Sequence, residues 1–251
     1  MPEKHLIGLW LERQNQVHHK NRPPVREAKI EETIIADGKV SVPSIRISPS
    51  KPVGAAVVVH GYGGSKEELL GLSWHVAQAG LVVDCIDLRG HGDHPLRFNE
   101  SVLDDVEAAI QNGRKFGKVV SIGHSLGGRL SLVSGADFAI GISPPLDGTN
   151  GERTEEMLRK LRGHRVRTDD PRAVFELLKQ IPTWNGEDSS RHMIIYGSRD
   201  IQEIVQACDR LRPSMPNALR IAGAMHADTF MLPATFEAVA RQLSEWYRVP
   251  L

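Results

Sequence analysis

The five residues Gly123 to Gly127, written GHSLG, hold a serine whose setting could support nucleophilic chemistry. They follow the apolar run KVVSI and precede small and apolar residues, so Ser125 lies where a strand is expected to end and a helix to begin. A sharp turn of this kind pushes the serine hydroxyl outward, and the flanking glycines keep the neighbouring chain clear of it. The pattern alone also fits a surface serine in a glycine-rich turn. Residues elsewhere in the chain must therefore show which of the two roles Ser125 has.

A serine hydroxyl needs a base to remove its proton, and histidine has a suitable pKa for this role. The chain has 11 histidines, so position must select among them. His226 lies in GAMHAD, after the last expected strand and before the last expected helix, at the sheet edge where Ser125 emerges. His124 adjoins Ser125, but neighbours on a tight turn point apart. We interpret His60 and His91 as residues that brace loops through hydrogen bonds.

The base also needs a carboxylate that orients it. Asp200 follows the expected strand MIIYGSR and precedes a helix, so it lies at the same edge of the sheet as the serine. An aspartate in this position commonly caps the following helix, and Asp200 could serve both purposes. Asp228 is too near His226 in sequence and Asp188 does not end a strand, which makes both weaker candidates.

Acyl transfer further requires donors for a developing oxyanion. Leu126, the residue after the serine, offers a backbone N–H group at the start of a helix. The loop HGYGGSKEE follows a buried strand and contains three glycines that let its backbone approach a ligand closely, and we choose the N–H group of Tyr62 as the second donor. A glycine-rich loop without a ligand is the alternative.

The elements that must position these residues alternate along the chain from residue 29. A hairpin is expected first, with strands at 29–37 and 39–47 joined by the turn DGK. Further strands are expected in VGAAVVVHG, LVVDCIDL, KVVSIG, FAIGIS, HMIIYGS and ALRIAG, and helical segments separate most of them. This order predicts an α/β fold, a doubly wound and mostly parallel sheet of about eight strands.

A long excursion over residues 144–190 interrupts this alternation. We expect two short helices in it, roughly at 154–162 and 171–180, with Asp170 as the N-cap of the second and Pro171 at its first position. Insertions of this length between two sheet strands are usually functional, so we expect a small helical lid over the ends of the strands.

Composition narrows the classes of function. Lys plus Arg and Asp plus Glu both number 31, so the formal net charge is 0, and nucleic acid is not an expected partner. Two cysteines are too few for a disulfide framework or a zinc cluster. The chain shows neither a signal peptide nor about 18 consecutive apolar residues, so we expect a cytoplasmic protein without stable membrane insertion. We also expect a helical extension at 1–28 before the domain at 29–251. The sequence does not decide whether the protein forms a homodimer.

Taken together, HGYGG, DLRGHGDH, GHSLGG, YGSRD and GAMHAD resemble the α/β-hydrolase superfamily, in family order from about residue 30 to the end of the chain. The pattern is similar to the branch of serine esterases and serine aminopeptidase-like enzymes. A serine at 125 argues against dehalogenases and epoxide hydrolases, which use aspartate there. The resemblance implies that Ser125, Asp200 and His226 form a catalytic triad, with Tyr62 and Leu126 as oxyanion donors.

We therefore expect a serine hydrolase that cleaves small to medium carboxylic esters through an acyl-enzyme, without a metal or an organic cofactor. The short, polar lid argues against a true lipase, because a lipid surface would require a broader apolar cap. A peptidase or a thioesterase with the same triad is the first alternative, since specificity resides in the lid and pocket. A non-catalytic binding protein on the same scaffold is the second alternative.

Overall fold

The computed structural model describes residues 27–36, 38, 40–147, 151–170, 172–186 and 188–250. The helical extension expected at 1–28 lies outside these residues, except for Glu27 and Ala28, and Ala28 begins the first strand. No helix within the described part is both long and apolar enough to cross a bilayer.

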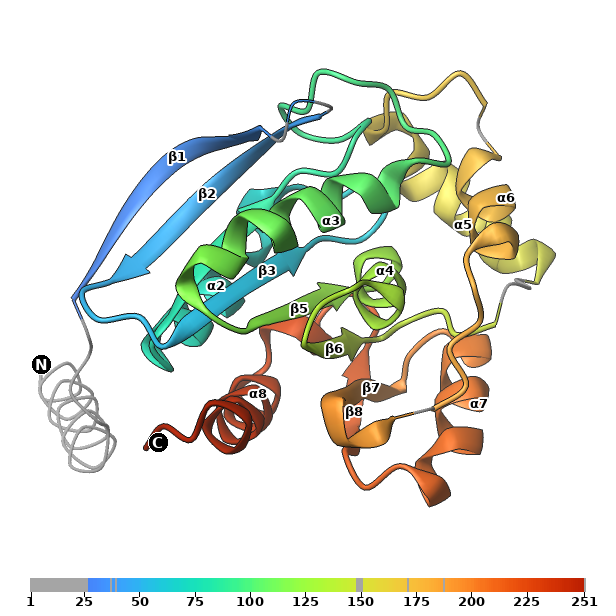
Figure 1. Cartoon of the computed structure of the whole chain (residues 1–251). Coiled ribbons are helices and arrows are strands. Elements are labelled where there is room, and N and C mark those ends of the chain that lie inside the picture. Colours follow the sequence, from blue (N-terminus) through green and yellow to red (C-terminus); the bar gives the residue numbers. More distant parts are fainter. Residues whose placement is uncertain are drawn as a thin grey trace, which may run out of the picture.

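An eight-stranded sheet runs through the described residues (Figure 1). Its order is β1-β2-β4-β3-β5-β6-β7-β8. β1 and β2 form an antiparallel hairpin, β2 pairs antiparallel with β4, and the other neighbours are parallel. The arrangement confirms the expected α/β fold with a mostly parallel sheet. The strands are β1 (Ala28–Ala36), β2 (Ser41–Pro49), β3 (Gly54–Val59), β4 (Leu81–Ile86), β5 (Val119–His124), β6 (Phe138–Ile142), β7 (His192–Arg199) and β8 (Ala218–Met225).

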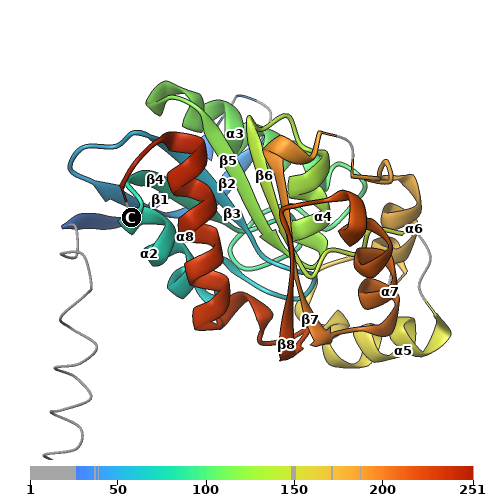
Figure 2. The same ribbon diagram turned by 90° about the horizontal axis from the view of Figure 1, so that it is seen from below.

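Helices cover both faces of the sheet (Figure 2). One face packs against α2 (Leu70–Gln78) and α8 (Pro233–Tyr247), and the other packs against α3 (Val102–Gly113), α4 (Leu126–Val133) and α7 (Gln202–Leu211). Every residue of the three central strands β3, β4 and β5 is buried. Burial on both faces explains why these strands are continuous apolar runs rather than alternating ones.

Two expected elements are shorter in the structure, and a buried lysine joins them where they meet. The helix expected from residue 65 begins with a 3₁₀ turn, Lys66–Leu69, and the strand expected to run through Leu88 ends at Ile86. Asp87 turns out of the strand, and its carboxylate accepts hydrogen bonds of 2.8 Å from both the backbone N–H and the ammonium group of Lys66. A buried ammonium group needs such partners, and this ion pair joins the start of the helical segment to the end of β4.

The chain between β6 and β7 contains α5 (Glu152–Leu161) and α6 (Ala173–Gln180), close to the two helices expected there. The prediction of Asp170 as the N-cap of the second helix is wrong, because α6 begins at Ala173 and its N-cap is Arg172. Asp170 instead accepts a 2.8 Å hydrogen bond from the N–H of Arg172 in the turn before the helix, and Pro171 lies outside the described residues. Figure 1 shows both helices beyond the ends of the central strands, on the same side of the molecule as the segment that follows β5. We call residues 144–190 the insertion from here on.

Candidate active site

Ser125 lies on a strained turn between β5 and α4. Its backbone angles are φ 54° and ψ −118°, a combination that costs free energy for any residue with a side chain. Its N–H donates a 2.8 Å hydrogen bond to the carbonyl oxygen of Ile142, which ties the turn to β6. Gly127 passes so close to β3 that a Cβ atom there would collide with the carbonyl oxygen of Val59. Glycine is therefore required next to the serine for the turn to pack against the sheet.

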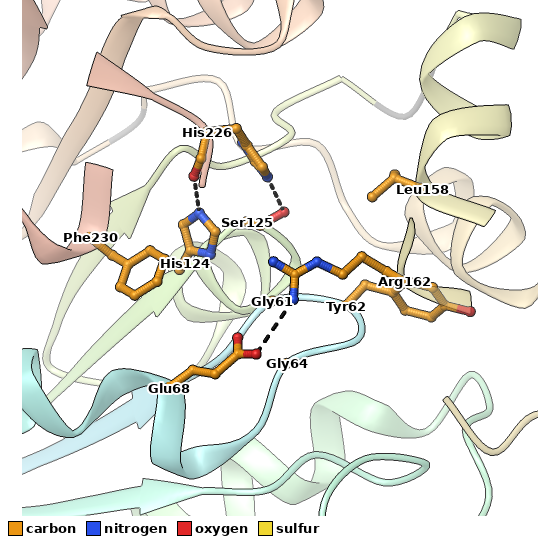
Figure 3. Close-up of a pocket in the computed structure, with 10 residues that line it drawn as sticks. All are labelled: Gly61, Tyr62, Gly64, Glu68, His124, Ser125, Leu158, Arg162, His226 and Phe230. Atoms are coloured by element: carbon orange, nitrogen blue, oxygen red, sulfur yellow. Dashed lines mark hydrogen bonds and ion pairs between the residues drawn. The ribbon is translucent and has the colours of Figure 1, made fainter. Parts of the chain in front are cut away.

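The structure brings Ser125, His226 and Asp200 together from three separate segments (Figure 3 shows the first two). The Nε2 atom of His226 is 3.0 Å from the Oγ atom of Ser125, and its Nδ1 atom is 2.7 Å from the Oδ1 atom of Asp200. The Asp200 side chain is fully buried, whereas 22% of the His226 side chain is exposed. A hydroxyl, an imidazole and a carboxylate are thus connected by two hydrogen bonds, with the hydroxyl end facing solvent.

Asp200 is held by more donors than His226 alone. The hydroxyl group of Ser143 donates to its Oδ2 atom at 2.5 Å, and the N–H of Ile201 donates to its Oδ1 atom at 2.7 Å. Burial by itself would raise the pKa of this carboxyl group, but the bonds from His226, Ser143 and Ile201 hold the pKa below its ordinary value. The capping role considered for Asp200 is not seen, because the N-cap of α7 is Ile201 and has no side-chain cap.

The two chosen oxyanion donors lie beside the serine. Leu126 is the first residue of α4, and Tyr62 follows Gly61, which lies so near the serine that a Cβ atom there would be 3.0 Å from the Ser125 Cβ. Within the described residues, neither the N–H of Tyr62 nor that of Leu126 has a hydrogen-bond acceptor. Two free donors next to a hydroxyl are the arrangement that oxyanion stabilisation requires.

Histidines support the loops around the site. The Nε2 atom of His91 accepts a 2.9 Å hydrogen bond from the N–H of Gly63, and the Nε2 atom of His60 accepts one of 3.1 Å from Leu88, so both brace loops as expected. His124 does not contact the Ser125 hydroxyl. Instead its Nε2 atom is 2.8 Å from the carbonyl oxygen of His226, so it holds the backbone of that residue.

The site opens into a small cavity of about 40 Å³. Three of its walls are the apolar side chains of Tyr62, Leu158 and Phe230, and the polar lining includes Glu68 and Arg162. Leu158 comes from α5, and Arg162 follows directly after α5, so the insertion contributes to the wall opposite Ser125 (Figure 3). The described residues contain no group of three His, Cys, Asp or Glu side chains that could hold a metal ion.

Sequence reasoning missed Ser143 and Arg162. Ser143 follows β6 as Asp200 follows β7, so its place at the end of a parallel strand was a usable signal. Arg162 gave no such signal, because the register and tilt of a short polar helix in an insertion depend on tertiary contacts.

Solved structures share the fold. An esterase from Pyrobaculum calidifontis has a TM-score of 0.63 and 20% identity, covering 94% of this chain and 89% of the other. The Pyrococcus furiosus esterase Pf2001 has a TM-score of 0.60 and 18% identity, covering 90% and 97%. A soluble variant of monoglyceride lipase from Saccharomyces cerevisiae has a TM-score of 0.59 and 15% identity, covering 93% and 99%.

No curated protein matches the sequence. The model of the alpha/beta hydrolase family, in contrast, matches residues 56–248, which is most of the chain and includes every candidate site residue discussed above. This match confirms the resemblance found in the sequence motifs. The chain therefore belongs to the alpha/beta hydrolase family.

Proposed function

We propose that the protein is a serine hydrolase that cleaves small to medium carboxylic esters through an acyl-enzyme intermediate. The proposal depends chiefly on one observation, the continuous hydrogen-bonded series Ser125–His226–Asp200 at the mouth of a cavity. A serine becomes a nucleophile when an adjacent base can remove its proton and a third group orients that base. Membership of a hydrolase family supports the same conclusion.

In the proposed reaction, the Oγ atom of Ser125 attacks the ester carbonyl while the Nε2 atom of His226 takes its proton. Asp200 holds the proton of His226 on Nδ1 and stabilises the imidazolium ion that forms. The N–H groups of Tyr62 and Leu126 receive the oxyanion. His226 then protonates the leaving alcohol, and a water molecule repeats the same steps on the acyl-enzyme to release the acid.

The dimensions of the cavity favour a small substrate. A space of about 40 Å³ holds only a few water molecules, far below the 300 Å³ or more of typical sites for drug-sized ligands. A short acyl group fits this space, and the longer part of an ester extends through its open mouth along the side chains that line it. The sequence-based predictions of a cytoplasmic location and of a homodimer remain predictions.

Hydrolysis of 4-nitrophenyl butyrate by wild type and Ser125→Ala tests the proposal. We expect kcat to fall about 10⁶-fold in the variant, because the nucleophile is lost while the fold is kept. Ser134→Ala is the matched control, since Ser134 lies just after α4 and its hydroxyl bonds only the carbonyl oxygen of Ser131. Its rate should equal that of wild type, and a fluorophosphonate probe should label wild type and the control but not Ser125→Ala.

Equal rates for wild type and Ser125→Ala would reject a serine nucleophile. Labelling of the folded protein at another residue would also reject it, in favour of a different nucleophile. Absence of labelling would favour a binding protein on a hydrolase scaffold. A panel of activated esters, acyl-CoA thioesters and aminoacyl amides compares the esterase with the thioesterase and peptidase alternatives. We expect the activated esters to have the highest kcat/KM.

A further inference from the structure

A positively charged side chain from the insertion reaches into the cavity that contains Ser125. Arg162 follows α5 and lines this cavity together with Ser125 and His226. Figure 3 shows its guanidinium group between the Glu68 carboxylate and Ser125 in that view. Only 33% of the Arg162 side chain is exposed, so the charge is partly withdrawn from water beside the proposed nucleophile.

The contacts of this guanidinium group are few and long. Its Nη1 atom is 3.4 Å from the carbonyl oxygen of Gly63 and 3.5 Å from the Oε1 atom of Glu68. Within the described residues, its Nε and Nη2 atoms have no hydrogen-bond acceptor. A guanidinium group has five N–H donors in a planar fork, so most of its capacity for binding an anion is unused.

Glu68 does not neutralise the charge, because it is shared. The same Oε1 atom accepts a closer bond, 3.1 Å, from the Nη1 atom of Arg165. Two guanidinium groups therefore compete for one carboxylate, and this edge of the cavity keeps an excess positive charge. The other basic residues nearby do not change this balance, because Lys160 pairs with Glu156 at 2.6 Å and the guanidinium group of Arg167 bonds backbone carbonyl oxygens of residues 91–94.

Arginine is the side chain best suited to bind a carboxylate in two-point fashion, and such bonds are about twice as strong as neutral ones. We propose, resting on the function proposed above, that the ester substrate carries a carboxylate group and that Arg162 binds it. Glu68 occupies Arg162 in the free enzyme, and the substrate carboxylate displaces it. The apolar walls of Tyr62, Leu158 and Phe230 accept the carbon chain between the ester and the carboxylate.

Two matched substrate pairs test this specificity. On the acyl side, 4-nitrophenyl hydrogen adipate is compared with 4-nitrophenyl hexanoate, which has the same number of acyl carbons and no charge. On the alcohol side, 4-acetoxybenzoate is compared with its methyl ester. The measured quantity is the selectivity, the kcat/KM of the charged ester divided by that of the neutral one, after subtraction of the rate with Ser125→Ala.

We expect wild type to prefer the charged ester of at least one pair, and Arg162→Gln to lower that selectivity about 10- to 100-fold, mainly through KM. Arg162→Lys should recover part of it, because the charge remains but the planar fork is lost. Glu68→Gln should raise the selectivity severalfold, because it removes the competing carboxylate. Arg165→Gln is the matched control: Arg165 also pairs with Glu68 but does not line the cavity, so the selectivity should change less than about threefold.

The opposite responses of Arg162 and Glu68 variants separate recognition from a merely structural contact between the insertion and the loop. If the Arg162–Glu68 pair only held α5 in place, both substitutions would change kcat/KM by the same factor for the charged and the neutral ester. The inference would then be wrong. Absence of any charge preference in an active wild type would also overturn it while leaving the proposed function intact. Equal activity of wild type and Ser125→Ala would instead reject the proposed function itself.

Discussion

At the scale of single residues, Ser143 is the group that most directly supports the proposed base. Its hydroxyl donates a 2.5 Å hydrogen bond to the Oδ2 atom of Asp200, while His226 uses the Oδ1 atom. Ser143 is fully buried and has a positive φ of 51°, so the backbone accepts strain to place this hydroxyl group. The bond fixes the plane of the carboxylate and thereby the orientation of the imidazole.

Ser143→Ala should therefore lower kcat about 10-fold or more and leave KM within about twofold, because a hydrogen bond to a charged group is lost away from the substrate. Kinetics with 4-nitrophenyl butyrate, corrected for the fraction of active enzyme by fluorophosphonate titration, checks this. Ser121→Ala is the control, since it removes a buried 2.8 Å bond to Ser131 without touching Asp200. Equal losses of kcat in both variants would show a general packing defect instead.

The order of motifs allowed Ser125, Asp200 and His226 to be predicted from the sequence, because each follows a recognisable strand and strand ends meet at one sheet edge. Arg162 could not be found in this way. Its position depends on how α5 rests on the loop at Gly63, where a Cβ atom would be only 2.6 Å from the Cβ atom of Arg162. Contacts between distant segments of this kind leave no local pattern.

At the scale of elements, Arg129 connects α4 to two segments of the insertion, its first residues and the residue after α6. Its side chain is fully buried, and its guanidinium group donates to the carbonyl oxygens of Leu146, Pro145 (3.3 Å) and Ile181 (3.1 Å). No carboxylate of the described chain lies within ion-pair distance, and burial lowers the pKa of Arg129 to about 10. A buried cation without a counter-ion is costly, and here it satisfies carbonyl groups at the start of the insertion and directly after α6.

Arg129→Met and Arg129→Lys should both lower the free energy of unfolding, by about 2–4 kcal/mol, because buried carbonyl groups lose their donors. The lysine variant should be the less stable one, since it keeps a buried charge but cannot reach three carbonyl groups. Urea unfolding measures both values. Limited trypsin digestion should cleave α5 faster in each variant than in wild type, whereas unchanged cleavage would contradict a role of Arg129 in holding the insertion.

The helices of the insertion could be predicted within a few residues, but their attachment could not. Periodicity and the Asp170 signal indicated two short helices, and the structure has them at Glu152–Leu161 and Ala173–Gln180. An arginine in a glycine-rich helix is expected at the protein surface, so the burial of Arg129 could not be predicted from the sequence. The same holds for Lys66, which is buried and forms an ion pair with Asp87.

At the scale of the whole molecule, burial keeps several histidines neutral. His91 and His124 are buried, and their burial, followed by the charge of a neighbouring histidine, lowers the pKa of each to about 3. The pKa of His60 is also lowered by burial. The hydrogen bonds agree, because the Nε2 atoms of His60 and His91 accept bonds from backbone N–H groups and cannot do so when protonated.

These lowered values make stability depend on pH in a defined direction. His91 and His124 have a pKa of 6.5 in the unfolded chain and of about 3 in the folded protein, so between these pH values the unfolded state binds more protons. The free energy of unfolding therefore falls as the pH falls through this range. The contribution of each of these histidines to the free energy of unfolding is fully present above pH 6.5 and is lost as the pH falls toward 3. Asp105 and Asp200, with pKa values below their ordinary 3.8, add a loss of the same sign only near pH 4 and below.

We therefore expect His91 and His124 each to make the free energy of unfolding fall by about 1 kcal/mol per pH unit between pH 6.5 and 4.5. His124→Gln tests one contribution, because the Gln Nε2 atom can still donate to the carbonyl oxygen of His226 but does not titrate. Urea unfolding at a series of pH values should give a slope that is smaller by about 1 kcal/mol per pH unit in the variant. Comparison at pH 8, where His124 is neutral in both the folded and the unfolded state, separates any packing cost of the substitution. Equal slopes in both proteins would mean that His124 accepts a proton in the folded state.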